Sequence, residues 1–385
     1  MKILHICLCG QFNENLSYQD NLLTKYHSLL GHDVSIIAPT LKFDDNGKII
    51  DLKKASVQKI GFDITLYRLN YKYNLPRFLN DKIRIYKGLK NTIESVAPEF
   101  IFIHGVQFID AYTIFKYLKR NSKILAVADN HADEFNSANG FFSKNVLHKI
   151  VWKNTAKLLS KVCKVIYGVT PNRCEFLKTT YNLDDDQVKL LPLGADDYKI
   201  SERKKKFDIN DFRNKYRLTQ EKRIISVGGK LDSKKNIEVL LAALGALTPK
   251  SFELLIFGTA LDPTLVDKIG NCEFAKFLGW KDQNDIIDIF LASDLTCFPG
   301  SHSVLWEQSI ACGVPGIFNK INGMEHILIN DNVILLDGAN QRELTEALSC
   351  VLFNSDRLNY MKNQAEQSAN HFFYSSIAKK ALNFE

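Results

Sequence analysis

The sequence lacks the features that mark several specialised classes of protein. Its 8 cysteines are scattered, with no C-x-x-C pair and no Cys/His spacing of a zinc site, so we expect reduced core thiols in a cytosolic protein. The longest aliphatic stretch, Val239–Leu247, is far too short to cross a bilayer. Residues 1–11 contain an apolar run without a cleavage site, which predicts a first strand and not a signal peptide.

Charge and composition exclude further classes. The net charge of +7 over 385 residues is a mild excess that fits an anionic ligand or an anionic membrane surface, and we expect no nucleic acid as a partner. Hydrophobic residues make up 45% and charged residues 24%, as in a soluble globular protein of two ordinary domains. No DxD-type metal motif stands out, because the acidic run Asp184–Asp186 predicts a solvated turn. We therefore expect no metal and no cofactor.

Strand-like and helix-like segments alternate along the whole chain. An opening strand over residues 2–9 is followed by a polar loop from Gly10, a helix over 17–30 and a second strand over 34–38. Further runs predict strands at 64–69, 100–104, 123–127, 165–169, 223–227, 252–257, 275–279 and 295–298. This alternation predicts doubly wound α/β sheets. The charged stretch 198–207, with its Lys/Arg run, predicts a linker between two domains.

The stretch 297–316 is the most informative. A buried strand ends at Phe298, a Pro-Gly turn follows, and Ser301 or Ser303 can cap a helix that carries Glu307. The free N–H groups of such a helix start suit a phosphate, and we expect the amides of 303–305 to supply them. Glu307 can then reach a sugar hydroxyl. The alternative is a helix-start acid that is favoured by the helix dipole alone.

A glycine-lysine segment follows the strand at 223–227. Gly228 and Gly229 let the backbone approach phosphate groups, and Lys230 and Lys235 supply positive charge. Together with the helix start that carries Glu307, this segment predicts a cradle for phosphate groups.

A histidine lies where a second group of ligand contacts is expected. His131, flanked by Asp129 and Asp133, follows the strand at 123–127, and ligand sites of open α/β sheets lie beyond the carboxyl ends of strands. The alternative is a solvated loop histidine.

Residues 141–164 contain no acidic side chain, and lysines recur there at every fourth position from Lys149 to Lys161. An amphipathic basic helix of this kind can lie on an anionic leaflet. The alternative is an ordinary surface helix whose apolar side packs on the sheet.

These motifs resemble those of retaining glycosyltransferases of the family-4 type. The run Glu307-Gln-Ser-Ile-Ala-Cys-Gly-Val-Pro is similar to the signature E-A-x-A-x-G-x-P, and residues 228–236 are similar to G-R-x-x-x-x-K-G, with Lys230 in place of the arginine. The family's first glutamate, eight residues before Glu307, is replaced by Pro299, and His302 is the nearest polar side chain that could substitute.

The resemblance implies a set of roles. Lys230 and Lys235 would grip the donor diphosphate, Glu307 the ribose, and His131 the donor sugar, without acting as a base. Trp280 follows a segment that meets the base, where it would stack or, as an alternative, belong to the core. The residues implied in substrate binding are Gly10, Asp129, Asp133, Gly228, Gly229, Trp280, His302, Ser303, Val304 and Leu305.

The resemblance also implies the GT-B fold, with two Rossmann-like doubly wound domains facing across a cleft. An acceptor domain would span 1–197, a donor domain 198–369, and a helix at 370–385 would cross back onto the first. We expect a metal-independent retaining transfer from a UDP- or GDP-type sugar to a glycan or lipid-linked acceptor in surface polysaccharide synthesis. The expected location is cytoplasmic, including the inner face of the plasma membrane. Alternatives are a nucleotide-sugar 2-epimerase and a non-catalytic nucleotide-sugar binding protein.

Overall fold

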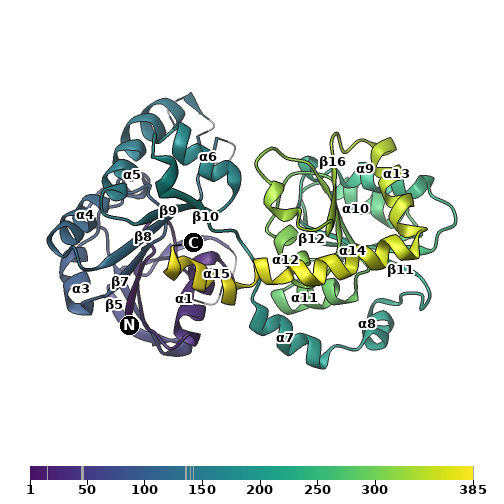
Figure 1. Ribbon diagram of the computed structural model, residues 1–385, viewed down its shortest axis with the longest axis horizontal. Helices are drawn as coiled ribbons and strands as arrows, with labels where there is room; N and C mark the ends of the chain where they lie inside the picture. Colours follow the sequence, from purple (N-terminus) through teal and green to yellow (C-terminus); the bar gives the residue numbers. More distant parts are fainter. Residues whose placement is uncertain (15, 45–46, 135–136, 139, 142, 385) are drawn as a thin grey trace. The chain divides into compact units, whose positions relative to one another are not determined.

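The structure is a computed structural model that describes residues 1–14, 16–44, 47–134, 137–138, 140–141 and 143–384. The chain forms two compact units (Figure 1). The first comprises Met1–Pro192 with Ile377–Glu385, and the second comprises Leu193–Ser376. The sequence placed these divisions at 197 and 370. Each unit contains a sheet of parallel strands covered by helices, so the predicted pair of Rossmann-like folds is confirmed.

The sheet of the first unit has eight strands, parallel except for the antiparallel pair β5–β6. Their order is β10 (Val188–Leu190), β9 (Val165–Gly168), β8 (Leu125–Asn130), β7 (Phe100–Ile103), β1 (Lys2–Ile6), β2 (Asp33–Pro39), β6 (Ile64–Leu69) and β5 (Ser56–Ile60). A hairpin joins β3 (Leu41–Phe43) to β4 (Ile49–Asp51). The helices are α1 (Gln19–Leu29), α2 (Arg77–Ile83), α3 (Leu89–Val96), α4 (Ala111–Arg120), α5 (Lys153–Ser160), α6 (Pro171–Thr179) and the end of α15 (Tyr374–Asn383).

The sheet of the second unit has six strands, all parallel. Their order is β13 (Ala275–Gly279), β12 (Phe252–Ala260), β11 (Arg223–Leu231), β14 (Leu295–Phe298), β15 (Gly316–Asn319) and β16 (Val333–Leu336). The helices are α7 (Asp197–Lys206), α8 (Ile209–Tyr216), α9 (Ile237–Ala246), α10 (Pro263–Gly270), α11 (Gln283–Ala292), α12 (Leu305–Ala311), α13 (Gln341–Leu352) and α14 (Ser355–Ser368).

The central strands are apolar because helices cover both faces of each sheet. Every residue of β7 and of β14 is buried, and both strands belong to the apolar core of their own unit. The loops at the carboxyl ends of these strands can therefore carry chemistry, while a few buried polar side chains such as Thr296 lie within the strands.

Two predicted boundaries were wrong. The expected linker at 198–207 is the helix α7, whose N-cap Asp196 accepts a hydrogen bond from the Lys199 amide at 3.3 Å. Its basic residues lie in the last turn, where the helix dipole favours positive charge, so the Lys/Arg run marks a helix end. Strand β8 runs to Asn130, which places Asp129 inside the sheet and not in the following loop.

The basic segment is not one regular helix. A π-helical stretch, Ser143–Trp152, precedes α5, while Phe142 lies outside the described residues. Of the lysines that recur at every fourth position, only Lys149 lies in the π-helical stretch, and the others belong to α5 and its C-cap Lys161. Trp152, Ala156 and Leu159 belong to the core of the first unit, as the surface-helix alternative predicts. In the described part of the chain, we find no helix with the length and apolarity needed to span a membrane.

The end of the chain packs within the first unit. In α15, the Ala378 carbonyl lies 3.1 Å from His27 Nε2, and the Lys380 carbonyl accepts a hydrogen bond from the Tyr167 hydroxyl at 3.3 Å.

Candidate functional site

Glycines bring three loops of the second unit into close contact. A Cβ on Gly258 would lie 1.9 Å from the Gly229 carbonyl oxygen, and one on Gly300 would lie 2.2 Å from the Lys234 carbonyl oxygen. Gly229 has φ +118°, and a Cβ on it would lie 3.4 Å from the Leu305 side chain and 3.9 Å from the Ser303 hydroxyl oxygen. The end of β11 therefore lies directly beside the start of α12, as the predicted phosphate cradle requires.

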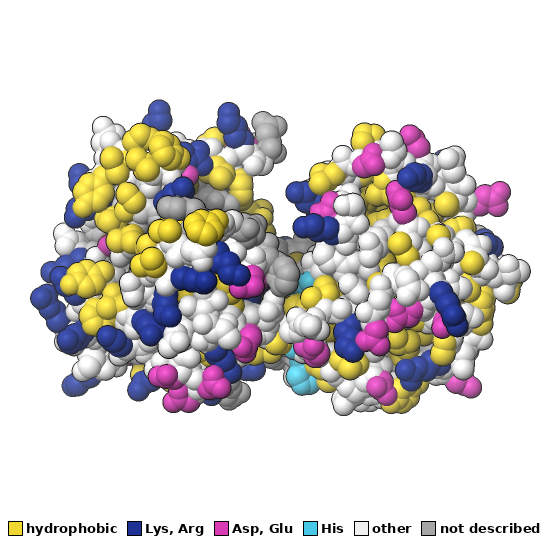
Figure 2. All heavy atoms as spheres, turned by 90° about the horizontal axis from the view of Figure 1, so that it is seen from above, with side chains coloured by type: hydrophobic (Ala, Val, Ile, Leu, Met, Phe, Trp, Pro, Cys, Tyr) yellow, Lys and Arg dark blue, Asp and Glu magenta, His cyan; other side chains and the backbone are white. Residues whose placement is uncertain are grey.

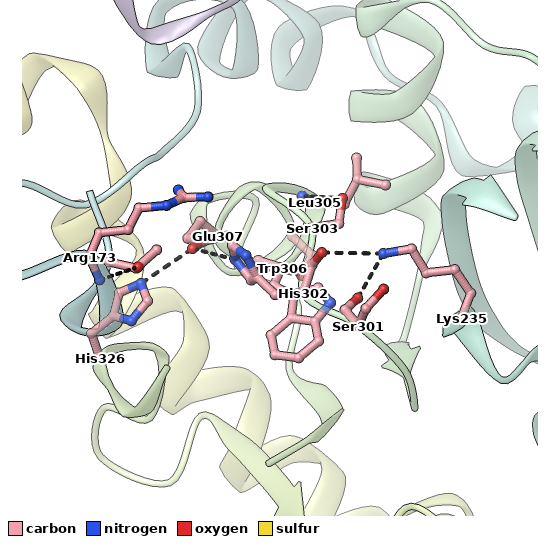
Figure 3. Close-up of polar contacts among 11 residues, drawn as sticks. Arg173, Lys235, Ser301, His302, Ser303, Leu305, Trp306, Glu307 and His326 are labelled. Carbon is pink, nitrogen blue, oxygen red and sulfur yellow. Dashed lines mark hydrogen bonds and ion pairs between the residues drawn. The ribbon is translucent and has the colours of Figure 1, made fainter. Parts of the chain in front are cut away.

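Lys235 connects two of these loops (Figure 3). Its Nζ donates to the carbonyl oxygens of Ser301 at 2.7 Å and of His302 at 3.3 Å. Burial lowers the pKa of Lys235, and the nearby Asp232 partly opposes this effect. Lys230, by contrast, is exposed at the end of β11. The two lysines of the motif thus differ: one is built into the loop framework, and the other projects into solvent.

Glu307 is completely buried and is held between two imidazoles (Figure 3). Its carboxylate lies 2.9 and 3.1 Å from His302 Nε2 and 3.2 Å from His326 Nε2. Burial alone would raise the pKa of Glu307, but the charge and hydrogen bonds of the histidines outweigh it and lower the pKa to about 2. Glu307 is therefore a carboxylate, and its neighbour His302 is 17% exposed.

Sequence reasoning assigned no role to His326. It follows β15, the neighbour of β14 in the sheet, and the loops after adjacent parallel strands lie together, so its position along the chain was a usable signal. His326 Nδ1 and the indole nitrogen of Trp306 are buried without a hydrogen-bond partner among the residues that the structure describes. Both nitrogens lie on residues around Glu307.

The helix carrying Glu307 begins later than a Ser cap would require. Its N-cap is Val304, and Leu305 N approaches the Ser303 hydroxyl at only 3.4 Å. The expected core alternative for Trp280 was wrong, because this side chain is 74% exposed just after β13. Its indole ring is available to stack on a planar ligand.

The first unit contains a cavity of about 580 Å³. Its walls come from the loop after β1, the start of α1, the loops after β7 and β8, and the π-helical stretch. The predicted residues Gly10 and His131 line it, and His104 and Gln19 join them.

The acidic neighbours of His131 do not line this cavity. Asp129 is fully buried and accepts a hydrogen bond from the Gly105 amide at 2.7 Å, while His131 Nε2 lies 3.5 Å from its Oδ2. Burial would raise the pKa of Asp129, but His131 and His104 outweigh burial and hold it well below its usual value. Asp133 pairs with Arg173 at 3.0 Å. Neither aspartate lines the cavity, and both contact other protein groups, so their role in substrate binding remains a prediction.

Gln19 was not predicted and is the most unusual side chain of this cavity. It is 5% exposed, yet neither its amide nitrogen nor its amide oxygen has a hydrogen-bond partner among the described residues. Each buried polar group without a hydrogen-bond partner lowers the stability of the fold by about 1–3 kcal/mol. Two such atoms on one cavity side chain indicate a side chain that binds a ligand.

Comparisons with known proteins agree with this arrangement. Residues 208–368 match the family model described as glycosyl transferases group 1. An uncharacterized glycosyltransferase of Methanocaldococcus jannaschii is 21% identical over 285 residues, which cover 69% of this chain and 70% of the relative. The predicted resemblance to GT-B glycosyltransferases is thereby confirmed, without confirmation of the family-4 subtype.

Solved structures share the fold over the full length. HepE of Anabaena in complex with UDP has a TM-score of 0.68 at 15% identity, covering 100% of this chain and 99% of its own. Sucrose-phosphate synthase from Thermosynechococcus elongatus has a TM-score of 0.66 at 16% identity, covering 100% of this chain and 98% of its own. UDP-GlcNAc 2-epimerase from Neisseria meningitidis has a TM-score of 0.60 at 13% identity, covering 100% of this chain and 99% of its own. At these identities the likeness shows the fold alone.

Proposed function

We propose that this chain transfers a sugar from a UDP- or GDP-type donor to a glycan or lipid-linked acceptor, with retention at the anomeric carbon. The match of residues 208–368 to the group 1 glycosyl transferase model supports a transferase. The observation that carries the proposal is the cluster of Gly229, Lys235, Ser303 and Glu307 at the carboxyl ends of β11 and β14. A relative solved with UDP supports a nucleotide donor.

The second unit would bind the donor. Backbone groups around Gly229 and the charges of Lys230 and Lys235 would stabilise the departing diphosphate without rearranging, which is the main way that such sites lower a barrier. The carboxylate of Glu307, presented through His302, would hold the ribose. Trp280 would stack on the base.

The transfer itself would need no protein base. The bond from the anomeric carbon to the diphosphate breaks, the bond to the acceptor hydroxyl forms, and the hydroxyl proton passes to the departing phosphate oxygen. Fixed cations suffice for this step, so we propose a metal-independent reaction.

The cavity of the first unit would bind the acceptor. Gln19 offers a donor and an acceptor from one amide, the pattern that a sugar hydroxyl matches. His131, which the resemblance assigns to the donor sugar, lines the same cavity and would position that sugar next to the acceptor. A neutral polyhydroxylated ligand fits these groups, and surface polysaccharide synthesis would use such an acceptor.

A direct experiment is to incubate the protein with UDP- and GDP-sugars, with and without glycan acceptors, and to follow the products. We expect transfer or slow donor hydrolysis. Epimerised donor would support the 2-epimerase, whose fold this chain shares, and donor binding without turnover would support a binding protein. Glu307→Ala should weaken nucleotide binding, and unaltered donor affinity in this variant would contradict the assigned donor site.

Membrane association is a secondary proposal that rests on charge. Figure 2 shows apolar side chains interspersed with Lys and Arg side chains on the visible face of the first unit. Phe141 is 85% and Ile150 55% exposed, beside the exposed Lys149. Changing Lys149 and Lys161 to glutamate should reduce binding to anionic vesicles, and unchanged binding would exclude this segment as the contact.

A further inference from the structure

A chain of buried histidines leads from the first-unit cavity to the C-terminal helix. His104 Nε2 lies 2.9 Å from His5 Nδ1, and His5 Nε2 lies 2.9 Å from His27 Nδ1. One end of the chain is the Ala378 carbonyl in α15, 3.1 Å from His27 Nε2. The other end is Asp129 Oδ2, 3.2 Å from His104 Nδ1. His5 and His27 are 0% exposed, and His104 is 7% exposed.

The two ends fix the direction of every hydrogen bond. A carbonyl oxygen only accepts, so His27 must carry its proton on Nε2. If His27 is neutral, its Nδ1 accepts and His5 must donate from Nε2. A neutral His5 then accepts at Nδ1, and His104 must donate from Nε2. The tautomer of each ring is thus determined by the ring before it.

The last link requires one more proton. His104 already donates from Nε2, but its Nδ1 faces a carboxylate oxygen, which also accepts. The four contacts need one proton each, whereas three neutral imidazoles carry three. Either one ring is an imidazolium or Asp129 is protonated.

Electrostatics decide where this proton lies. Burial, together with the neighbouring rings, lowers the pKa of His5, and burial lowers that of His27 to about 3. Asp129 Oδ1 accepts a hydrogen bond from the Gly105 amide at 2.7 Å, independently of His104, and this bond favours the ionised carboxylate. His104 is the remaining ring, and it lies against the carboxylate, where a positive charge is compensated.

We propose that His104 is a positioning residue, held as an imidazolium by the His5–His27 chain, that fixes the Asp129 carboxylate and through it His131 at the cavity. The role of His104 in acceptor binding rests on the proposed function, whereas the number of protons in the histidine chain follows from its hydrogen bonds alone. Other titratable groups also face the chain. Cys7 and Cys9 beside β1 and Asp20 in α1 add no positive charge. His32 before β2 lowers the pKa of His27, and His131 after β8 lowers that of Asp129, as positive charges do.

The protonation state can be measured directly. In protein with ¹⁵N-labelled histidine, at pH 8, both ring nitrogens of His104 should carry protons, although a histidine in water is neutral there. His5 and His27 should each carry one proton, on Nε2. Loss of signals in His104→Gln assigns the ring. A singly protonated His104, or a protonated Asp129 carboxyl in ¹³C spectra, would overturn the proposal.

Breaking the chain should release the extra proton. In His27→Leu, His5 is free to donate from Nδ1, so His104 accepts at Nε2 and becomes neutral while still donating to Asp129. His5→Phe should have the same effect and serves if His27→Leu does not fold. His32→Gln, outside the chain, is the matched control and should leave His104 doubly protonated. A doubly protonated His104 in both chain variants would contradict the proposal, and none of these readouts depends on turnover.

Discussion

The candidate sites of the two units are built in different ways. In the second unit the site is formed mainly by backbone groups: glycines allow the loops to touch, and Lys235 donates to two carbonyl oxygens. In the first unit the site is formed mainly by side chains, namely Gln19, the histidine chain and Asp129. A site formed by the backbone requires glycines at a fixed spacing, which can be recognised in the sequence. A network of side chains requires no such spacing. This difference explains which site could be predicted.

The largest expected effect is on the backbone-built site. Lys235→Met should reduce sugar transfer by about 10²–10³-fold, because the proposed diphosphate site would lose one preorganised positive charge. The exposed neighbour Lys234 provides the matched control, and Lys234→Met should stay close to wild type. Steady-state turnover of the donor measures both. Equal losses of turnover in the two variants would mean that activity depends on the total positive charge of the loop and not on Lys235 in particular.

Glu307→Gln should lower stability by on the order of 3 kcal/mol near neutral pH. The pKa of Glu307 in the folded protein, about 2, lies below the ordinary value of about 4.3, so its contribution is present above about pH 4.3 and is lost as the pH falls toward 2. Urea unfolding between pH 2 and 7 should show that the free energy of unfolding falls less steeply with decreasing pH in the variant than in the wild type. The exposed Glu325 gives the control Glu325→Gln, which should keep the wild-type slope.

Two glutamines of the first-unit cavity should respond in opposite directions. Gln19→Met removes two unsatisfied polar atoms and should stabilise the protein by about 1–3 kcal/mol. Gln107→Met removes bonds to Asn130 and the Tyr181 hydroxyl and should destabilise it. Thermal unfolding of both variants makes the comparison. A lower melting temperature for Gln19→Met would show that this amide has a structural role.

The smallest effect is expected at Trp280. Because its side chain is 74% exposed, Trp280→Ala should leave the melting temperature unchanged and weaken donor binding by about 1 kcal/mol, or roughly fivefold. Calorimetric titration of the nucleotide tests this expectation. Donor affinity equal to that of the wild type would remove Trp280 from the site.

The sequence was sufficient for the fold class, because apolar strands alternate with helices in both units. It also placed Lys235 and Glu307 in neighbouring segments at the carboxyl ends of β11 and β14, while their roles in donor binding remain predictions. It failed where tertiary contacts decide. Asp129 follows an apolar run like a loop residue, but backbone pairing with Tyr167 of β9 keeps it within β8.

The missed residues share a physical reason. Nothing near Gln19 in the sequence shows that its amide is buried, and nothing near His326 shows that Glu307 lies 3.2 Å away. Both facts arise from elements that meet only in the folded sheet. The linker prediction failed because a charged run can equally end a helix, as it does in α7.

Calorimetric titration of UDP and GDP into the wild type and into Lys235→Met tests the central claim most directly. The account predicts that at least one of the two binds the wild type and binds the variant at least tenfold more weakly. Equal affinity for both proteins, or no binding of either nucleotide to the wild type, would contradict a diphosphate cradle formed by Gly229, Lys235 and the start of α12.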